Sequence, residues 1–185
     1  MCRSRLKRIF LLFAWLLASP AWALDSDRQQ PIQIEADRLD VDDAKGIGVY
    51  RGDVRYTQGT LELKAAEVMI YSTQERSLAR VVAVGNPATF EQQIDPAGGV
   101  LTGEAQTIEY NVTTEQLLLK GSAHLVYCGD EFASDHIEFL AAKDLVKAGK
   151  SPQGGGRVQV TIQPRVRDQS GKLTQSPCRR LNVAP

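Results

Sequence analysis

The sequence has few of the residues that enzymes most often use for catalysis. It contains two histidines and three cysteines in 185 residues. Neither the phosphate-binding pattern Gly-x-x-x-x-Gly-Lys-Ser/Thr nor the nucleophile pattern Gly-x-Ser-x-Gly occurs in it. We therefore expect a protein without enzymatic activity and without a cofactor.

The histidines do not form a convincing metal site either. His124, Cys128 and His136 could be grouped as three ligands. On a strand, however, His124 and Cys128 would share one face at a separation of about 13 Å, which is too far for one ion. We interpret both histidines as surface or edge residues.

Four aspartates near the start, Asp37, Asp40, Asp42 and Asp43, resemble a calcium-binding loop only loosely. They lack the D-x-D-x-D-G spacing of such a loop. We interpret them as solvated carboxylates at a turn.

An excess of positive charge is also lacking. The chain has 22 Lys and Arg against 22 Asp and Glu. Four of these cations lie in the first 23 residues, so that 18 remain against 22 acids, a net charge of −4, in the rest. Such a chain has no electrostatic footprint for a nucleic acid.

The N-terminal residues have the pattern of an export signal. Arg3, Arg5, Lys7 and Arg8 precede an apolar stretch over residues 9–17, which is short for a membrane span. Ala21-Trp22-Ala23 then supplies a small-x-small cleavage site. We predict that residues 1–23 form a cleavable signal peptide. An uncleaved anchor is the alternative, and the break at Ser19-Pro20 argues against it.

Cys128 and Cys178 remain after removal of the leader. In an oxidising compartment two cysteines can pair, but two unconnected thiols are equally compatible with their positions, one in an expected strand and one in a polar tail.

A repeated phrase dominates the rest of the chain. A small residue, a polar residue and an apolar/polar alternation recur at residues 36–41, 66–71, 105–110 and 134–139. Each phrase is followed by a glycine, at Gly52, Gly85, Gly121 and Gly149, and the first three glycines open a second expected strand. Units of this size cannot close a core alone and must stack on neighbours.

Period-two alternation begins at residues 32–35, after a short polar lead-in over residues 24–30, and ends with a strand over residues 157–163. Residues 140–147 have helical propensity, but the repeat favours a strand there. We predict an all-β fold of short stacked antiparallel strands over residues 24–164, followed by a polar, disordered tail over residues 165–185.

Three phrases carry a resemblance to a known family. They are residues 30–37 (QPIQIEAD), the Gly52-Asp53-Val54 segment leading to Thr57-Gln58-Gly59-Thr60, and residues 85–90 (GNPATF). In this order and behind a leader, they resemble the OstA-like family of lipopolysaccharide-transport proteins over residues 30–163.

The resemblance implies a twisted antiparallel β-jellyroll that is open at both ends and apolar inside. It implies a periplasmic carrier that holds the lipid A part of lipopolysaccharide in this interior. It also implies end-to-end stacking with copies of itself, with an inner-membrane LptC-type component and with an outer-membrane LptD-type component. The two cysteines and the tail depart from the family pattern and put the C-terminal contact in doubt.

Alternation and the family pattern together select the interior lining residues Ile32, Ile34, Phe90, Tyr110 and Val112. Ordinary core packing would select the same residues. The first and last strands should present unpaired edges to neighbours. The predicted contact residues are Ile32, Gln33, Ile34, Glu35, Val158, Gln159, Val160, Thr161 and Ile162.

Two alternatives remain open. One is a membrane-anchored LptC-type relative with the same fold. The other is a structural β-repeat protein with a filled core and no cargo.

Overall fold

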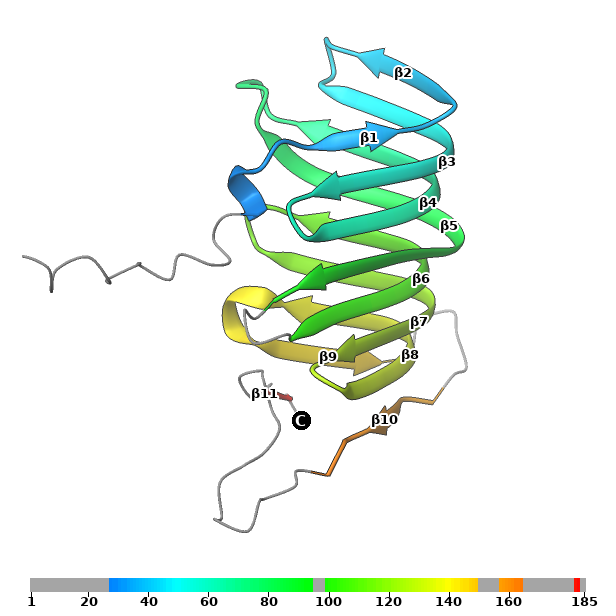
Figure 1. The fold of residues 1–185 in the computed structure, drawn as a ribbon, viewed down its shortest axis with the longest axis vertical. Coiled ribbons are helices and arrows are strands. Elements are labelled where there is room, and N and C mark those ends of the chain that lie inside the picture. The colour runs from blue at the N-terminus through cyan, green and yellow to red at the C-terminus, as the bar shows by residue number, and fades with distance from the viewer. Residues whose placement is uncertain (1–26, 95–98, 150–156, 165–181, 184–185) are drawn as a thin grey trace, which may run out of the picture.

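Strands stacked along one long axis make up almost all of the described chain (Figure 1). The computed structural model describes residues 27–94, 99–149, 157–164 and 182–183. Its strands are β1 (Gln33–Glu35), β2 (Arg38–Asp42), β3 (Ile47–Gln58), β4 (Leu61–Ser72), β5 (Leu78–Gln93), β6 (Val100–Asn111), β7 (Gln116–Tyr127), β8 (Asp130–Leu140), β9 (Leu145–Gly149), β10 (Gln159–Thr161) and β11 (Asn182–Val183). Two 3₁₀ turns, η1 (Asp27–Gln29) and η2 (Ala141–Lys143), complete it, and these ranges contain no α-helix. The predicted all-β class is confirmed.

The sheet is an antiparallel meander from β3 to β8, and its ends do not pair with each other. β1 and β2 both pair with β3 at one end, whereas β9 and β10 both pair with β8 at the other. β11 pairs with β9 and is parallel to it. The outermost strands are therefore β1 and β2 at one end and β10 and β11 at the other.

Every long strand is bent near its middle, and the bends fold the sheet over on itself. The pairing register shifts between residues 51 and 54, 64 and 67, 84 and 88, 104 and 107, and 120 and 123. We call the part formed by residues 54–65, 88–105 and 123–134 with β1 and β10 half-sheet A. Half-sheet B is formed by residues 47–51, 67–84, 107–120 and 136–140 with β2, β9 and β11. The bends lie on one side of the stack and most of the turns on the other (Figure 1).

Glycines allow these bends. Gly52 and Gly121 have φ of 83° and 78°, and Asp53 and Ser122 after them also have positive φ. Consecutive left-handed residues produce a bulge that turns the strand. Gly52, Gly85 and Gly121 were predicted to open a second strand. This was wrong, because β3, β5 and β7 each run through the glycine as one bent strand, although the pairing register shifts there.

Small side chains line the inside of the bends, where the half-sheets converge. Ala88, Ala105 and Ala123 are at most 2% exposed there, and Ser134 donates a hydrogen bond to the carbonyl oxygen of Gly149 at 2.6 Å. Larger apolar side chains lie farther from the bends. The interior is therefore narrow at the bends and wider toward the turns.

The inward-facing side chains form rows that cross the whole stack. Residues opposite each other on paired strands point to the same face of a sheet. In half-sheet A the pairing register yields the row Ile34, Tyr56, Leu63, Phe90, Gly103, Leu125, Phe132 and Val160. In half-sheet B it yields Leu39, Tyr50, Val68, Ala83, Ile108, Leu119, Ile137 and Ala148. Both rows are apolar throughout.

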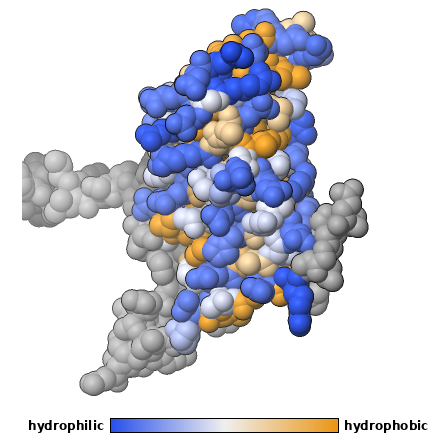
Figure 2. Space-filling model, turned by 90° about the vertical axis from the view of Figure 1, so that its right-hand side faces the viewer, coloured by the Kyte–Doolittle hydropathy of each residue, from blue (hydrophilic) through white to orange (hydrophobic). Residues whose placement is uncertain are grey.

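The opposite surface of the strands is polar. Figure 2 looks onto the side of the bends, where hydrophilic residues predominate over scattered apolar ones. Ion pairs link neighbouring strands on this outer surface, such as Arg51 with Glu67 at 2.6 Å and Lys120 with Glu109 at 3.0 Å. The lowered pKa of Glu109 has the hydrogen bond from Lys120 as its main cause.

The repeated phrase has a structural counterpart. The phrases over residues 66–71, 105–110 and 134–139 lie in β4, β6 and β8, mostly after the bend, and the phrase over residues 36–41 leads into β2. Each phrase is thus a strand of half-sheet B running in the same direction. Of residues 140–147, Leu140 ends β8, residues 141–143 form η2 and residue 145 begins β9. The predicted strand is therefore confirmed for β9 and wrong for residues 141–143.

The predicted signal peptide, residues 1–23, lies outside the described residues. The predicted disordered tail also lies outside them, except for Asn182–Val183 in β11. The predicted first and last strands are present but shorter, at Gln33–Glu35 and Gln159–Thr161.

A substitution at Gly103 tests the tight packing of the inward row in half-sheet A. A Cβ at Gly103 would run into the ring of Phe90, whereas a Cβ at Gly149 would meet no atom within 4 Å. We expect Gly103→Ala to destabilise the fold by about 1–3 kcal/mol, measured by urea unfolding. Gly149→Ala is the matched control and should not lower the stability. Equal stability of both variants would contradict this packing.

Candidate functional site: an apolar groove between the half-sheets

A large hollow lies between the two half-sheets. Its volume is about 1150 Å³, somewhat above the roughly 300–1000 Å³ of pockets for drug-sized ligands. Both half-sheets contribute to it through the inward rows and the residues next to them. Its apolar lining consists of Ile32, Leu61, Leu63, Leu78, Val81, Phe90, Ile94, Leu101, Ile108, Tyr110, Val112, Leu117, Phe139 and Ala141.

Four of the five residues predicted to line the interior border this groove. They are Ile32, Phe90, Tyr110 and Val112. Phe90 is 6% exposed and lies in the wall of the groove, whereas Ile32 is 39% exposed and lies at its rim. Ile34 faces the same side but packs against the core and does not border the groove. Whether any of them contacts a lipid stays a prediction.

Most of the residues that line the groove were not predicted from the sequence. Leu63, Val81, Ile108, Leu117 and Phe139 belong to the same alternating pattern. The pairing register was the missing information: it places Leu63 opposite Phe90 in half-sheet A and Leu117 opposite Phe139 in half-sheet B. Leu119, Leu125 and Ile137 belong to the same inward-facing rows, but they are 0% exposed and do not border the groove, whose lining reaches Phe139 of β8 and Ala141 of η2.

The polar groups of the groove are uncharged or held at its rim. Tyr56 is 2% exposed and donates a hydrogen bond to Gln58 Oε1 at 3.2 Å. Burial raises the pKa of Tyr56 to about 12, and burial is also the main cause of the raised pKa of Tyr110. Both phenols are therefore neutral at physiological pH, as suits an apolar interior.

Residues 27–30, which the sequence analysis treated as a polar lead-in, are built into the groove. Asp27, Arg28, Gln29 and Gln30 all border it. Asp27 accepts hydrogen bonds from Thr60 and Gln92 of half-sheet A. Arg28 contacts Glu115 and Tyr110 of half-sheet B. No sequence signal marked this segment, because its contacts are polar and distant along the chain.

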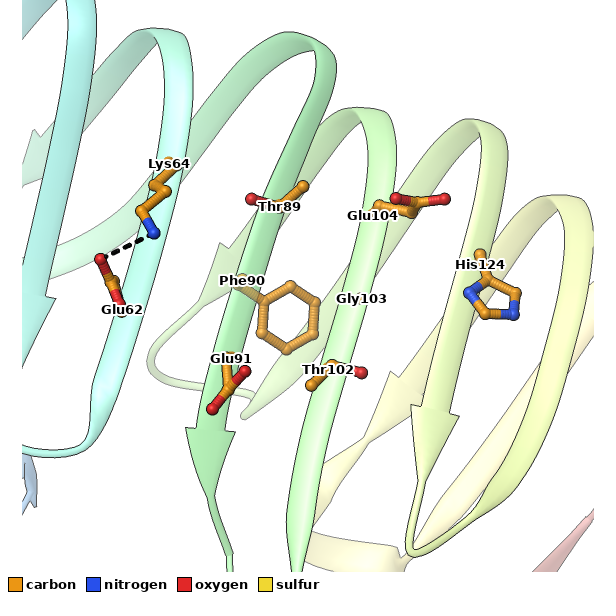
Figure 3. Close-up of a pocket in the computed structure, with 9 residues that line it drawn as sticks. All are labelled: Glu62, Lys64, Thr89, Phe90, Glu91, Thr102, Gly103, Glu104 and His124. Carbon is orange, nitrogen blue, oxygen red and sulfur yellow. Dashed lines mark ion pairs between the residues drawn. The ribbon is translucent and has the colours of Figure 1, made fainter.

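A second, smaller hollow of about 300 Å³ lies on the outer surface of half-sheet A (Figure 3). Phe90 and Gly103 border it together with charged and polar side chains from β4 to β7. Glu62 and Lys64 form an ion pair at 3.0 Å within it, and His124 lies 3.9 Å from Glu131 beside it. These groups form no nucleophile and base arrangement.

The candidate metal ligands do not converge. The described residues contain no group of three His, Cys, Asp or Glu side chains that could hold a metal ion. His124 lies opposite Ala133 in half-sheet A, whereas His136 lies opposite Lys120 in half-sheet B. The aspartates of the N-terminal turn pair with separate cations: Asp40 with Arg51, Asp42 with Lys45 and Asp43 with Arg76.

Cys128 lies in the turn between β7 and β8 and not within a strand as expected, and its φ is 55°. It is disulfide-bonded. Cys178, the predicted partner, lies outside the described residues, so this pairing stays a prediction. Among the described residues, no helix has the length and apolar character needed to cross a membrane.

The fold and the groove agree with a comparison to solved structures. The chain resembles the crystal structure of LptH, described as the LptA homologous periplasmic component of the lipopolysaccharide transport device from Pseudomonas aeruginosa. The TM-score is 0.69 and the sequence identity 34%, over 75% of this chain and 99% of that structure.

Sequence comparisons give the same family. The lipopolysaccharide export system protein LptH of Pseudomonas aeruginosa is 36% identical over 173 residues, which cover 90% of this chain and 98% of the relative. LptA of Haemophilus influenzae is 33% identical over 84% of this chain and 88% of the relative. LptA of Escherichia coli K12 is 28% identical over 91% of this chain and 92% of the relative.

A family model described as "LptA/(LptD N-terminal domain) LPS transport protein" matches residues 33–144. This match confirms the predicted resemblance, and with the relatives it confirms a periplasmic transport protein that is not an enzyme. The chain belongs to the LptA/LptH family of periplasmic lipopolysaccharide-transport proteins.

Proposed function

We propose that this chain carries lipopolysaccharide through the periplasm with the acyl chains of lipid A in the groove between the half-sheets. The observation that carries the proposal is a hollow of about 1150 Å³ lined by inward-facing apolar residues of both half-sheets, such as Leu63 and Phe90 of half-sheet A and Val81 and Leu117 of half-sheet B. The relatives that share this fold are named as lipopolysaccharide export proteins.

The physical need for such a groove follows from the cargo. Each methylene exposed to water costs about 0.8 kcal/mol, so an acyl chain of a dozen carbons costs on the order of 10 kcal/mol. A carrier lowers this cost only if apolar surface replaces water along the chain. Rows of Leu, Val, Ile and Phe without a charged side chain provide such surface.

We further propose that the carrier joins other subunits end to end. The apolar rows of both half-sheets extend into the outermost strands, where their last residues are exposed. At one end Leu39 and Val41 are 51% and 64% exposed, and at the other Val160 and Ile162 are 47% and 68% exposed. Since Leu39 and Val160 lie opposite inward-facing Tyr50 and Phe132, a neighbouring stack would bury them and continue the groove.

The partners in this arrangement are copies of the chain, an inner-membrane LptC-type component and an outer-membrane LptD-type component. The matching family model groups LptA with the N-terminal domain of LptD, which supports a related fold at the outer-membrane end. Edge strands of one fold can pair with edge strands of the other, because main-chain hydrogen bonds need no specific side chain.

The two alternatives differ in what they require of the groove and of the N-terminus. A cargo-free structural protein would have a filled core, and the open volume beside Leu63 and Val81 speaks against it. An LptC-type relative would retain its N-terminal apolar segment. N-terminal sequencing of the mature protein distinguishes this alternative, since export with cleavage leaves a chain that starts at Leu24.

Site-specific photo-crosslinking tests the cargo site. With a photoreactive amino acid at Tyr110 or Leu61, labelled lipopolysaccharide should crosslink, because both residues border the groove. The matched positions Lys64 and Lys120 lie on exposed outer surface and should give little product. Equal crosslinking at the two kinds of position would contradict cargo inside the groove.

A charge at the exposed end of the row tests the stacking contact. Val160→Asp should weaken end-to-end association by roughly tenfold or more, because burying Val is worth about 1.5–3 kcal/mol and a buried carboxylate costs more. Light scattering across a concentration series measures the association. Val84→Asp is the matched control, because Val84 is also an exposed valine, at 37%, but lies in β5 away from both ends of the stack. Unchanged association of Val160→Asp would contradict this contact.

A further inference from the structure

The open side of the groove is bridged by a short segment near the N-terminal end of the stack. This segment, residues 27–30, includes η1 and precedes β1, and we call it the strap. Figure 1 shows η1 on the side of the turns, away from the bends. All four residues of the strap border the groove.

Four hydrogen bonds hold the strap to half-sheet A, and the two that Asp27 accepts are partly buried. Asp27 is 8% exposed, and its carboxylate accepts hydrogen bonds from Thr60 Oγ1 at 2.5 Å and Gln92 Nε2 at 3.5 Å. Gln58 Nε2 donates to the carbonyl oxygens of Arg28 and Gln30, each at 3.2 Å. The turn at Gly59 is shaped for this contact, because a Cβ there would collide with the Asp27 carboxylate.

The contacts to half-sheet B are of a different kind. Arg28 Nη1 lies 2.5 Å from Glu115 Oε1, in the turn between β6 and β7, and Arg28 Nη2 lies 3.5 Å from the hydroxyl of Tyr110. The side chains of Arg28 and Glu115 are 56% and 30% exposed. An ion pair this accessible to water contributes little to stability and is weakened by salt.

The strap is thus attached more firmly to half-sheet A than to half-sheet B, like a latch that is fixed on one side. We propose that the strap closes the open side of the groove and that separation of Arg28 from Glu115 lets acyl chains enter from the side, with the strap still attached to half-sheet A. The inference rests on the proposed lipid-carrying function. It assigns Asp27 the role of the fixed anchor, and Arg28 and Glu115 that of the releasable contact.

A lateral route has a physical advantage for a lipid with several acyl chains. The ends of the stack are the proposed contact surfaces, and passage of cargo through them requires a neighbouring subunit in place. Opening of the strap would expose the groove from the side, since all four residues of the strap border it, so that several acyl chains could enter together without such a neighbour.

Charge reversal tests the latch. The rate of uptake of lipopolysaccharide that carries a fluorescent acyl chain is measured by stopped-flow fluorescence. We expect Arg28→Glu and Glu115→Arg each to speed uptake by up to about fivefold, because an exposed ion pair of this kind is lost. The double variant Arg28→Glu with Glu115→Arg restores the pair with reversed charges and should return the rate toward that of the unchanged chain.

Lys45→Glu is the matched control, because Lys45 forms an exposed ion pair with Asp42 at 2.6 Å in the turn between β2 and β3. It should leave uptake unchanged. Hydrogen exchange supplies a readout that does not depend on cargo: the backbone amides of residues 28–30 should exchange faster in Arg28→Glu than in Lys45→Glu.

The outcomes separate the two proposals. If the unchanged chain takes up no lipopolysaccharide, the proposed function fails, and this inference fails with it. If the unchanged chain takes up cargo but Arg28→Glu and Glu115→Arg have its rate, only the latch is contradicted. Failure of the double variant to restore the rate would also contradict it. Faster uptake by the unchanged chain at high salt, with no such change in Arg28→Glu, would support it.

Discussion

Cross-strand contact between inward-facing apolar side chains is the interaction on which the rest of this structure depends. Each strand is too short to bury its own apolar face, and each gains a core only from the strands beside it and the half-sheet opposite. The same contact that stabilises the fold therefore produces a continuous apolar wall. Where the half-sheets converge on alanines the wall is closed, and where larger side chains hold them apart it borders a groove.

This origin of the groove links stability, cargo and assembly. Repetition of strands does not by itself end a row, so Leu39 and Val160, the last apolar residues of the rows, are exposed in the outermost strands β2 and β10. A closed barrel would avoid these edges but would also give the groove no continuation. Each end instead carries short strands that leave main-chain groups for a neighbour. In the proposed function, the unfinished ends and the apolar interior serve one purpose.

The sequence predicted the class of fold and the alternation because both depend on local patterns. Period two along each strand identified Phe90 and Tyr110 as inward-facing, and the repeat placed β9 where helical propensity alone favoured a helix. It could not predict that strands continue through Gly52 and Gly121, because a bulge and a turn use the same residues.

The contacts of the strap and the pairing register of the strands also could not be predicted from the sequence. Asp27 contacts Thr60 and Gln92, and Arg28 contacts Glu115, so each contact joins residues far apart in the chain. No periodicity connects such positions. Leu63 and Val81 could be identified as apolar alternation, but only the folding of the sheet brings them to one groove, Leu63 from half-sheet A and Val81 from half-sheet B.

Methyl NMR with a paramagnetic label in the acyl chain tests most directly whether the inward rows hold lipid. A nitroxide within the acyl region of bound lipopolysaccharide broadens the signals of nearby methyl groups. The account predicts strong broadening for Leu63, Val81 and Leu117, which border the groove. Leu118 and Val126, the neighbours on the outer face, should keep their signals. Broadening of the outer methyl groups without that of the inner ones would contradict the account.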